Sequence, residues 1–167
     1  MNIEREQIFV WSGKIRLFHW INVIAILLLV FIGVVILNSK LFGISTDGKI
    51  LLKTFHVIVG YIFAANLLFR LIIGFIGTAH ERWNKTLPFN KGFKEELVEF
   101  KQQKKVAYKG HNPAGKLMVL ALLFLMTVQA ISGLVIARTD IYYPPLGRYF
   151  AERIAIDQKN IRDIKPY

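Results

Sequence analysis

The stretch LLKTFHVIVGYIFAANLLFR, residues 51–70, is apolar over most of its length but carries His56 near one end and Arg70 near the other. Titratable and charged groups at membrane depth are costly, so each is expected to have a partner or a function. Arg70 follows His56 by 14 residues, close to four helical turns, which places both side chains on one face of a helix. The stretch predicts a membrane helix with functional polar residues at two depths.

The composition of the whole chain agrees with a membrane protein. The chain has 167 residues, of which 54% are hydrophobic, and its mean hydropathy is +0.41. It has no cysteine, which excludes disulfides, thiolate nucleophiles, iron–sulfur clusters and covalently attached haem, and makes histidine the leading candidate metal ligand. The net charge of +11 comes from basic residues between apolar runs. It therefore indicates membrane topology and contact with anionic lipid rather than nucleic acid.

Three apolar runs are long enough to cross a bilayer. They cover residues 17–37, 51–76 and about 114–136. All three are predicted to be helices, because lipid offers no hydrogen-bond partner to an unpaired backbone. A cleavable signal peptide is a poor interpretation of the first run, since further spans follow it and no small-residue cleavage site comes directly after it. We expect an all-α transmembrane bundle in a single membrane domain, residues 1–167.

Lysine and arginine set the predicted orientation, because cytoplasmic loops are enriched in them. Residues 80–113 are rich in basic side chains, whereas the link between the first two runs has few. We therefore expect 80–113 to be cytoplasmic, the N-terminus to be cytoplasmic, and 137–167 to be an outer tail. FKEELVEFKQQKKV, residues 93–106, has apolar residues at helical spacing at Phe93, Leu97 and Phe100, which predicts a short helix that either lies on the inner surface or is solvated. A second surface helix is predicted in the tail from an apolar face made of Phe150, Ile154, Ile161 and Ile164.

His19 and His56 lie at opposite membrane depths in this orientation. His19 is just inside the inner face, and His56 is about one and a half turns inside the outer face. The two imidazoles are then roughly 20 Å apart along the helical rise, so they cannot share one metal. Each is suited to supply one axial ligand to its own haem. The alternative for each is a hydrogen-bonding residue between helices.

Glycines gather at the predicted depth of His56. Gly60 follows His56 by one turn, and Gly33 and Gly133 reach a similar depth from the other two runs. Small residues let a flat macrocycle approach the helix backbones. Arg70 falls near the inner face, where its cation either pairs with a haem propionate or extends to the lipid headgroups. No residue is predicted to be a catalytic acid, base or nucleophile.

Several motifs together resemble the prokaryotic b-type di-haem cytochromes, the family that includes the cytochrome b subunit of nickel–iron hydrogenases. They are IRLFHW at residues 15–20, a histidine followed by glycine and arginine four and 14 residues later, GHNPAGKLMVLALL at 110–123, and QAISG at 129–133. The resemblance implies a four-helix membrane bundle with two non-covalent b haems, one near each face. Such a protein carries electrons between a periplasmic redox partner and the quinone pool.

Carried over by position, the resemblance implies that His19 and His56 are axial iron ligands and that Arg70 is the second-run arginine of the family. It also implies a bacterial inner membrane, with the outer tail periplasmic. The expected partners are membrane lipid, quinone, and a periplasmic redox protein such as a c-type cytochrome or a hydrogenase. The resemblance implies a respiratory electron-transfer subunit, and a quinone-linked oxidoreductase complex is the kind of assembly to which such a subunit would belong. The alternatives are a transporter or channel subunit that uses the intramembrane His and Arg, and a non-redox membrane anchor.

The family has a fourth helix that supplies the other two axial histidines, whereas this sequence has no fourth apolar run before Tyr167. We interpret the three runs as three of four expected helices, and residues 1–167 as the N-terminal portion of a longer chain. If the chain is complete, the opposite ligands come from a second protomer in a homodimer or from another subunit.

Overall fold

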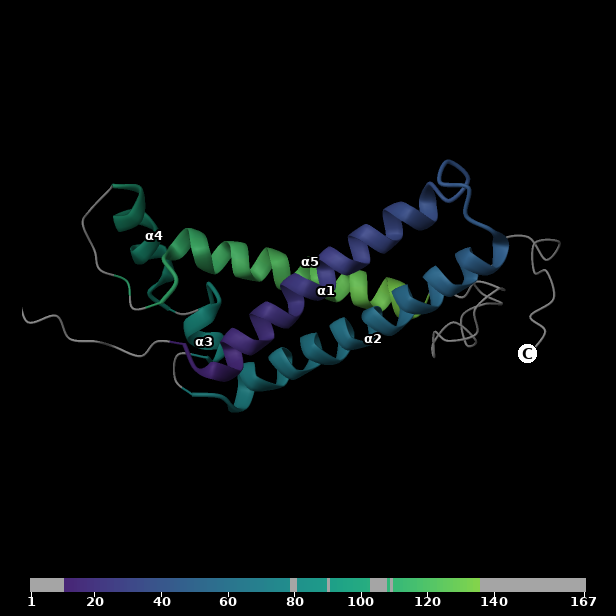
Figure 1. Ribbon diagram of the computed structural model, residues 1–167. Helices are drawn as coiled ribbons and strands as arrows, with labels where there is room; N and C mark the ends of the chain where they lie inside the picture. The colour runs from purple at the N-terminus through teal and green to yellow at the C-terminus, as the bar shows by residue number, and fades with distance from the viewer. Residues whose placement is uncertain (1–10, 79–80, 90, 103–107, 109, 136–167) are drawn as a thin grey trace, which may run out of the picture. The chain divides into compact units, whose positions relative to one another are not determined.

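The computed structural model describes residues 11–78, 81–89, 91–102, 108 and 110–135. Within these residues the chain is helical and has no strand, as the sequence predicts. The helices are α1 (Gly13–Leu37), α2 (Thr46–Ile76), α3 (Trp83–Thr86), α4 (Phe93–Lys101) and α5 (Pro113–Val135), drawn in Figure 1. The predicted tail helix and His80 lie outside the described residues.

The three long helices, α1, α2 and α5, are each long and apolar enough to cross a membrane. The prediction of three membrane helices is therefore confirmed. Two of them begin earlier than their apolar runs, at Gly13 and at Thr46. A search for apolar runs does not find these first turns, because their residues are polar. The sequence does mark the beginning of α2 with an N-cap residue. The Ser45 hydroxyl oxygen accepts a hydrogen bond from the Gly48 N–H at 3.1 Å, as an N-cap residue does.

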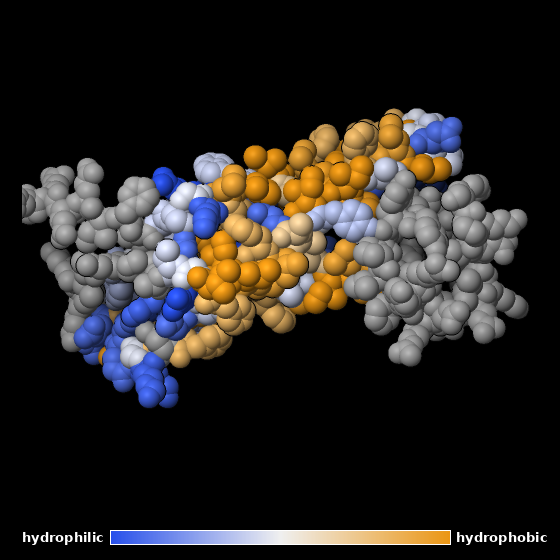
Figure 2. All heavy atoms as spheres, turned by 90° about the horizontal axis from the view of Figure 1, so that it is seen from below, coloured by the Kyte–Doolittle hydropathy of each residue, from blue (hydrophilic) through white to orange (hydrophobic). Residues whose placement is uncertain are grey.

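The long helices expose large apolar side chains to their surroundings. Phe31 of α1 is 68% exposed and Phe75 of α2 is 74% exposed, and Figure 2 shows the apolar side chains of one face in orange. A water-soluble monomer rarely leaves contiguous apolar patches of this kind uncovered. Hydrocarbon accepts such a surface, so the exposure agrees with helices that lie in lipid.

The described residues form two compact units, and each long helix contributes to both. The Arg70 unit takes the residues up to Trp20 and those from Leu68 to Leu125, and the His56 unit takes Ile21–Leu67 and those from Met126 onward. Buried side chains of the Arg70 unit include Ile73, Leu87, Leu123, Arg70, Glu81, Thr86 and Lys116. Those of the His56 unit include Ala25, Phe63, Leu67, Asn22 and Ser39. Both units thus bury polar groups, which in native proteins are normally hydrogen-bonded.

The short helix predicted within residues 93–106 is α4, which ends at Lys101. Its Glu96 carboxylate forms an ion pair with the Lys116 ammonium of α5 at 2.5 Å. The side chain of Lys116 is only 8% exposed, so the ion pair provides the counter-charge that a buried ammonium requires. Asn112 caps α5, because its side-chain oxygen accepts a hydrogen bond from the Gly115 N–H at 2.7 Å. The ion pair thus ties α4 to the beginning of α5, which Asn112 caps.

Candidate functional site

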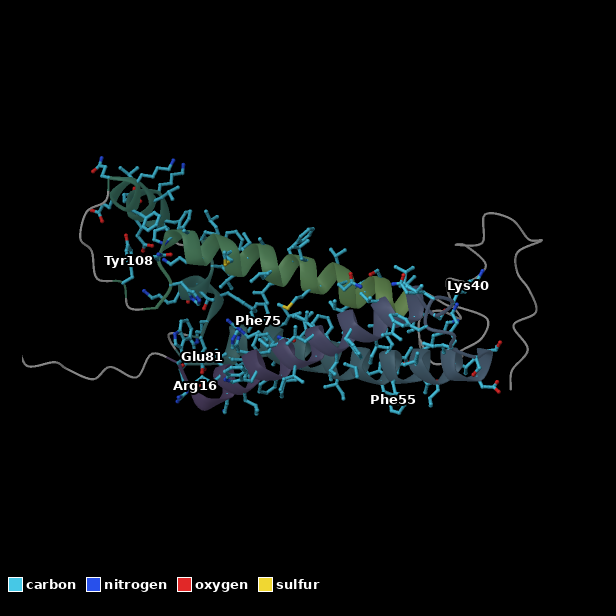
Figure 3. The ribbon with its side chains drawn as sticks, turned by 45° about the horizontal axis from the view of Figure 1, so that its top comes forward. Arg16, Lys40, Phe55, Phe75, Glu81 and Tyr108 are labelled. Carbon is cyan, nitrogen blue, oxygen red and sulfur yellow. The ribbon has the colours of Figure 1, made fainter. Side chains whose placement is uncertain are left out.

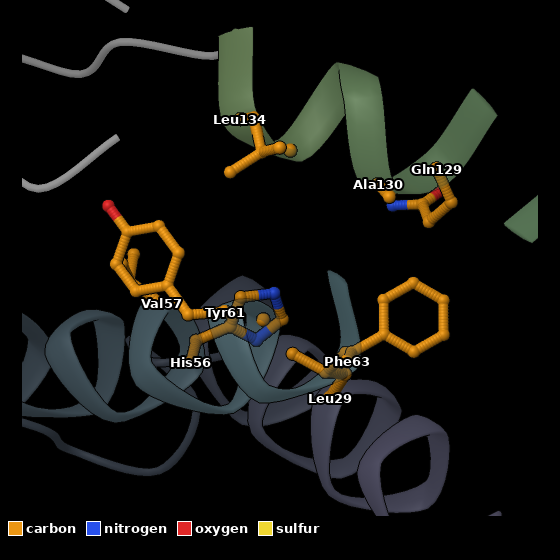
Figure 4. Close-up of a pocket in the computed structure, with 10 residues that line it drawn as sticks. Leu29, His56, Val57, Tyr61, Phe63, Gln129, Ala130 and Leu134 are labelled. Atoms are coloured by element: carbon orange, nitrogen blue, oxygen red, sulfur yellow. The ribbon is translucent and has the colours of Figure 1, made fainter. Parts of the chain in front are cut away.

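A pocket of about 90 Å3 adjoins His56 inside the His56 unit. In Figure 4, His56, Tyr61 and Phe63 of α2 lie across from Gln129, Ala130 and Leu134 of α5, and Leu29 of α1 completes the view. Most of these side chains are apolar. The pocket is therefore suited to an apolar group that also needs one or two polar contacts.

The imidazole of His56 supplies the titratable group at this pocket. Its Nδ1 atom is buried and has no hydrogen-bond partner among the described residues. A buried polar atom without a partner is costly, and native proteins leave few of them. Neutral imidazole is also the commonest protein metal ligand. The unpartnered Nδ1 atom indicates that the imidazole of His56 interacts with a further group when the site is filled.

The three glycines predicted at the depth of His56 are brought together with it. A Cβ atom added to Gly33 of α1 would lie 3.6 Å from Cε1 of His56, so this backbone passes directly beside the imidazole. Gly60 and Gly133 both line the pocket. A Cβ atom at either would meet nothing within 4 Å among the described residues. The donor, the missing side chains and the apolar lining match the chemistry of a flat macrocycle held by His56, and a cavity of about 90 Å3 has room for only part of it. That these residues serve a haem stays a prediction.

His19 is placed differently, because it belongs to the Arg70 unit and is exposed on α1. Its ring lies edge-on to Trp20, with 5.7 Å between the ring centroids. Among the described residues, no cluster of three or more His, Cys, Asp or Glu side chains could hold a metal ion.

Arg70 lies in the Arg70 unit, as His19 does, and its guanidinium is held within the protein. The residue is 4% exposed. Its Cζ atom lies 4.3 Å from the ring centroid of Trp83, and its Nη1 donates a hydrogen bond to the backbone oxygen of Glu81 at 3.3 Å. A guanidinium over an indole face is a cation–π contact. The second-run arginine is thus packed against the segment that follows α2.

Trp83 fits into a gap that Gly74 leaves on α2. A Cβ atom at Gly74 would lie 1.8 Å from Cε2 of Trp83, a distance that no real pair of atoms adopts. The indole also meets Phe75 edge-on, with 6.3 Å between the ring centroids. The absence of a side chain at Gly74 therefore allows α3 to dock on α2.

The carboxylate of Glu81 joins the beginning of α1 to the turn that follows α2, within the Arg70 unit. It accepts hydrogen bonds from the hydroxyl of Ser12 and from the backbone N–H of Thr78 at 2.8 Å. Figure 3 shows Glu81 close to the beginning of α1, near Arg16. The Ser12 hydrogen bond is the main cause that lowers the pKa of Glu81, and burial opposes it. The carboxylate is therefore held in its charged form.

His111 occupies the turn before α5 and was not predicted as a ligand. Its ring lies 4.8 Å from that of Trp11 between centroids. Its Nδ1 atom is buried without a hydrogen-bond partner among the described residues. Burial lowers the pKa of His111, and the positive charges of Arg70 and Lys116 lower it further. A neutral imidazole therefore stands at this turn at pH 7.

Comparison with known proteins adds independent information. Residues 10–162 match the family model described as prokaryotic cytochrome b561. A probable Ni/Fe-hydrogenase B-type cytochrome subunit of Rhizobium leguminosarum bv. viciae is 30% identical over 146 residues, which cover 78% of this chain and 60% of that protein. The protein of the same description from Rhodobacter capsulatus is 28% identical over 142 residues, which cover 77% of this chain and 54% of that protein. The chain thus spans between half and two thirds of the length of these relatives. No solved structure matches the chain.

Proposed function

Because the chain belongs to the prokaryotic cytochrome b561 family, we propose that it forms part of a membrane b-type cytochrome that carries electrons. The observation that carries this proposal is the His56 pocket. There, an imidazole with an unpartnered nitrogen lies beside an apolar cavity and three glycine backbones. The relatives are described as probable Ni/Fe-hydrogenase cytochrome subunits. We therefore propose a hydrogenase or a c-type cytochrome as the periplasmic partner, and quinone as the second redox partner.

We propose two haem sites, with His56 as an axial ligand of the outer haem and His19 as an axial ligand of the inner haem. Bound b haem supplies one-electron redox chemistry. At the outer site, Gly33, Gly60 and Gly133 leave room for the macrocycle, and the apolar side chains of the pocket keep water away. A dry, apolar shell is one of the features by which a protein tunes a haem potential.

At the inner site, we propose that His19 ligates iron and that Arg70 balances negative charge. The exposure of His19 on α1 leaves its ring accessible to a group bound against that helix. Arg70 provides a buried cation in the same compact unit. A guanidinium pairs well with a carboxylate, so a haem propionate is the proposed partner of its charge. The abundance of lysine in residues 80–113 supports a cytoplasmic position for this end of the chain.

The proposal is tested by absorption spectroscopy of the purified, haem-replete full-length protein. A dithionite-reduced minus oxidised difference spectrum should show b-type bands. His19→Ala and His56→Ala should each remove a different haem, whereas His111→Ala, which changes a histidine outside the proposed ligand set, should keep both. A colourless protein would contradict the cytochrome function and favour a transporter or an anchor. Loss of the same haem in both variants would contradict the two-site arrangement.

A further inference from the structure

We infer that Ser12 and Glu81 form a positioning pair that fixes the direction in which His19 points. The inference rests on the proposed function, because it concerns His19 as the ligand of the inner haem. In this account neither Ser12 nor Glu81 touches iron or porphyrin. Both act through the backbone of α1.

His19 needs such support because its own ring contact does not fix it. The residue is exposed, and its ring meets Trp20, the next residue of the same helix. Trp20 is itself 61% exposed. A contact within α1 moves with α1, so it cannot set the direction of His19 relative to the rest of the Arg70 unit. The rotation of α1 about its own axis must therefore be set at another point.

Ser12 provides that point, because it directly precedes α1. Its backbone oxygen accepts a hydrogen bond from the Arg16 N–H at 3.2 Å, and its hydroxyl oxygen lies 3.4 Å from the Ile15 nitrogen. The same hydroxyl donates to the carboxylate of Glu81, 69 residues away in sequence. The beginning of α1 is thus joined to the turn that follows α2.

Glu81 is a firm anchor for this contact. It is 2% exposed, and its carboxylate also accepts from the Thr78 N–H at 2.8 Å. Its backbone oxygen accepts a hydrogen bond from Arg70 at 3.3 Å. A buried carboxylate with several donors has little freedom to move, because each alternative position leaves a polar group unpaired.

The helical repeat connects Ser12 to His19. Seven residues separate them, which is nearly two turns, so the two lie on the same face of α1 to within about 20°. Lys14, whose charge also acts on Glu81, lies about 200° around the helix from Ser12. If the Ser12 hydroxyl is lost, a rotation of α1 that brings Lys14 toward Glu81 turns His19 away from its present direction. Ligand geometry must hold to within about 10–20° in a preorganised site.

The test uses purified, haem-loaded full-length protein. Ser12→Ala removes the hydroxyl, and Ser12→Thr keeps one. Ser45→Ala removes a comparable helix cap at the start of α2, in the His56 unit, and serves as the matched control. The midpoint potential and the largest EPR g value are measured for both haems. The haem that His19→Ala removes identifies the inner signal, and the other haem reports whether each variant is folded.

Ser12→Ala should shift the potential and the g value of the inner haem and leave those of the outer haem unchanged. Ser12→Thr and Ser45→Ala should keep the inner signals of the wild type. Ser12→Ala should have no further effect in a Glu81→Ala background, since the two residues act as one contact. An unchanged inner haem in Ser12→Ala, or equal shifts of both haems, would overturn the inference while leaving the cytochrome function intact. A wild-type protein without b-type bands would instead overturn the proposed function.

Discussion

Replacement of Gly74 by alanine should displace Trp83 from α2. The added Cβ atom would lie 1.8 Å from Cε2 and 2.2 Å from Nε1 of the indole. Carbon atoms in contact normally stay about 3.5–4.0 Å apart, so the ring has to shift by roughly 2 Å. The same ring lies against Arg70 at 4.3 Å. The substitution therefore disturbs both the docking of α3 and the contact of the buried guanidinium.

The size of the effect follows from three contributions. Overpacking a tight site costs about 1–3 kcal/mol, and a weakened contact between Arg70 and Trp83 adds about 0.5–2 kcal/mol. Alanine in place of glycine in a helix returns about 1 kcal/mol. The net loss should be about 2 kcal/mol, which corresponds to a fall in melting temperature of about 4–8 °C for a chain of this length.

The assay is thermal unfolding of the detergent-purified protein, followed by circular dichroism. The matched control is Gly74→Ala in a Trp83→Ala background, where the obstructing ring is absent. There the substitution should be neutral or slightly stabilising, because only the gain in helix propensity remains. A wild-type melting temperature for Gly74→Ala would show that the indole does not fill the space beside Gly74. An equal loss with and without Trp83 would show that a clash with the indole is not the cause.

Three further outcomes are expected. Gly60→Leu fills the pocket at His56 and should remove about half of the haem per protein if two haems bind. Gly92→Leu, at an open position, should keep the full haem content. A pyridine haemochromogen assay measures the haem content of both variants. Glu96→Gln leaves the buried Lys116 ammonium without a charged acceptor and should cost about 1–3 kcal/mol in thermal unfolding. Glu95→Gln, at an exposed residue of the same helix, should cost little. The pKa of His111 is lowered in the folded protein. As pH falls, His111 therefore takes up a proton in the unfolded chain before it does so in the folded one, and the free energy of unfolding should fall below pH 6.5, the ordinary pKa of histidine. The melting temperature should therefore fall between about pH 8 and 5. The fall should be smaller in His111→Gln, which lacks the titrating imidazole.

The fold was predictable because lipid leaves a long apolar segment few choices. Residues 51–76 have to satisfy their backbone internally, and a helix is the way to do so within one segment. The meeting of Gly33 with His56 was also predictable, since a fixed rise per residue converts sequence spacing into membrane depth. The 3.6 Å separation of that Cβ position from the imidazole agrees with the spacing argument. Within a continuous helix, the spacing of residues in the sequence therefore predicts which of them lie at the same membrane depth.

The surroundings of Arg70 were not predictable in the same way. Trp83 belongs to a helix of four residues, and Glu81 lies in the turn before it, so neither takes part in a repeating pattern. The contact of Ser12 with Glu81 spans 69 residues and depends on the path of a loop. Gly74, one turn after Arg70, was a possible signal, because a glycine within a membrane helix often marks close packing. Its partner could still not be identified from sequence.

The two predicted ligands, His56 and His19, differ in what holds their side chains in place. His56 lies at a cavity whose glycines and apolar side chains come from continuous helices, so its setting follows from regular geometry. His19 is exposed, and its direction depends on a turn contact at the start of α1. A site that depends on one buried polar contact is sensitive to single substitutions, because each loss leaves a partner unsatisfied. If both proposed haems bind, substitutions outside the ligand set should for this reason alter the haem at His19 more readily than the haem at His56.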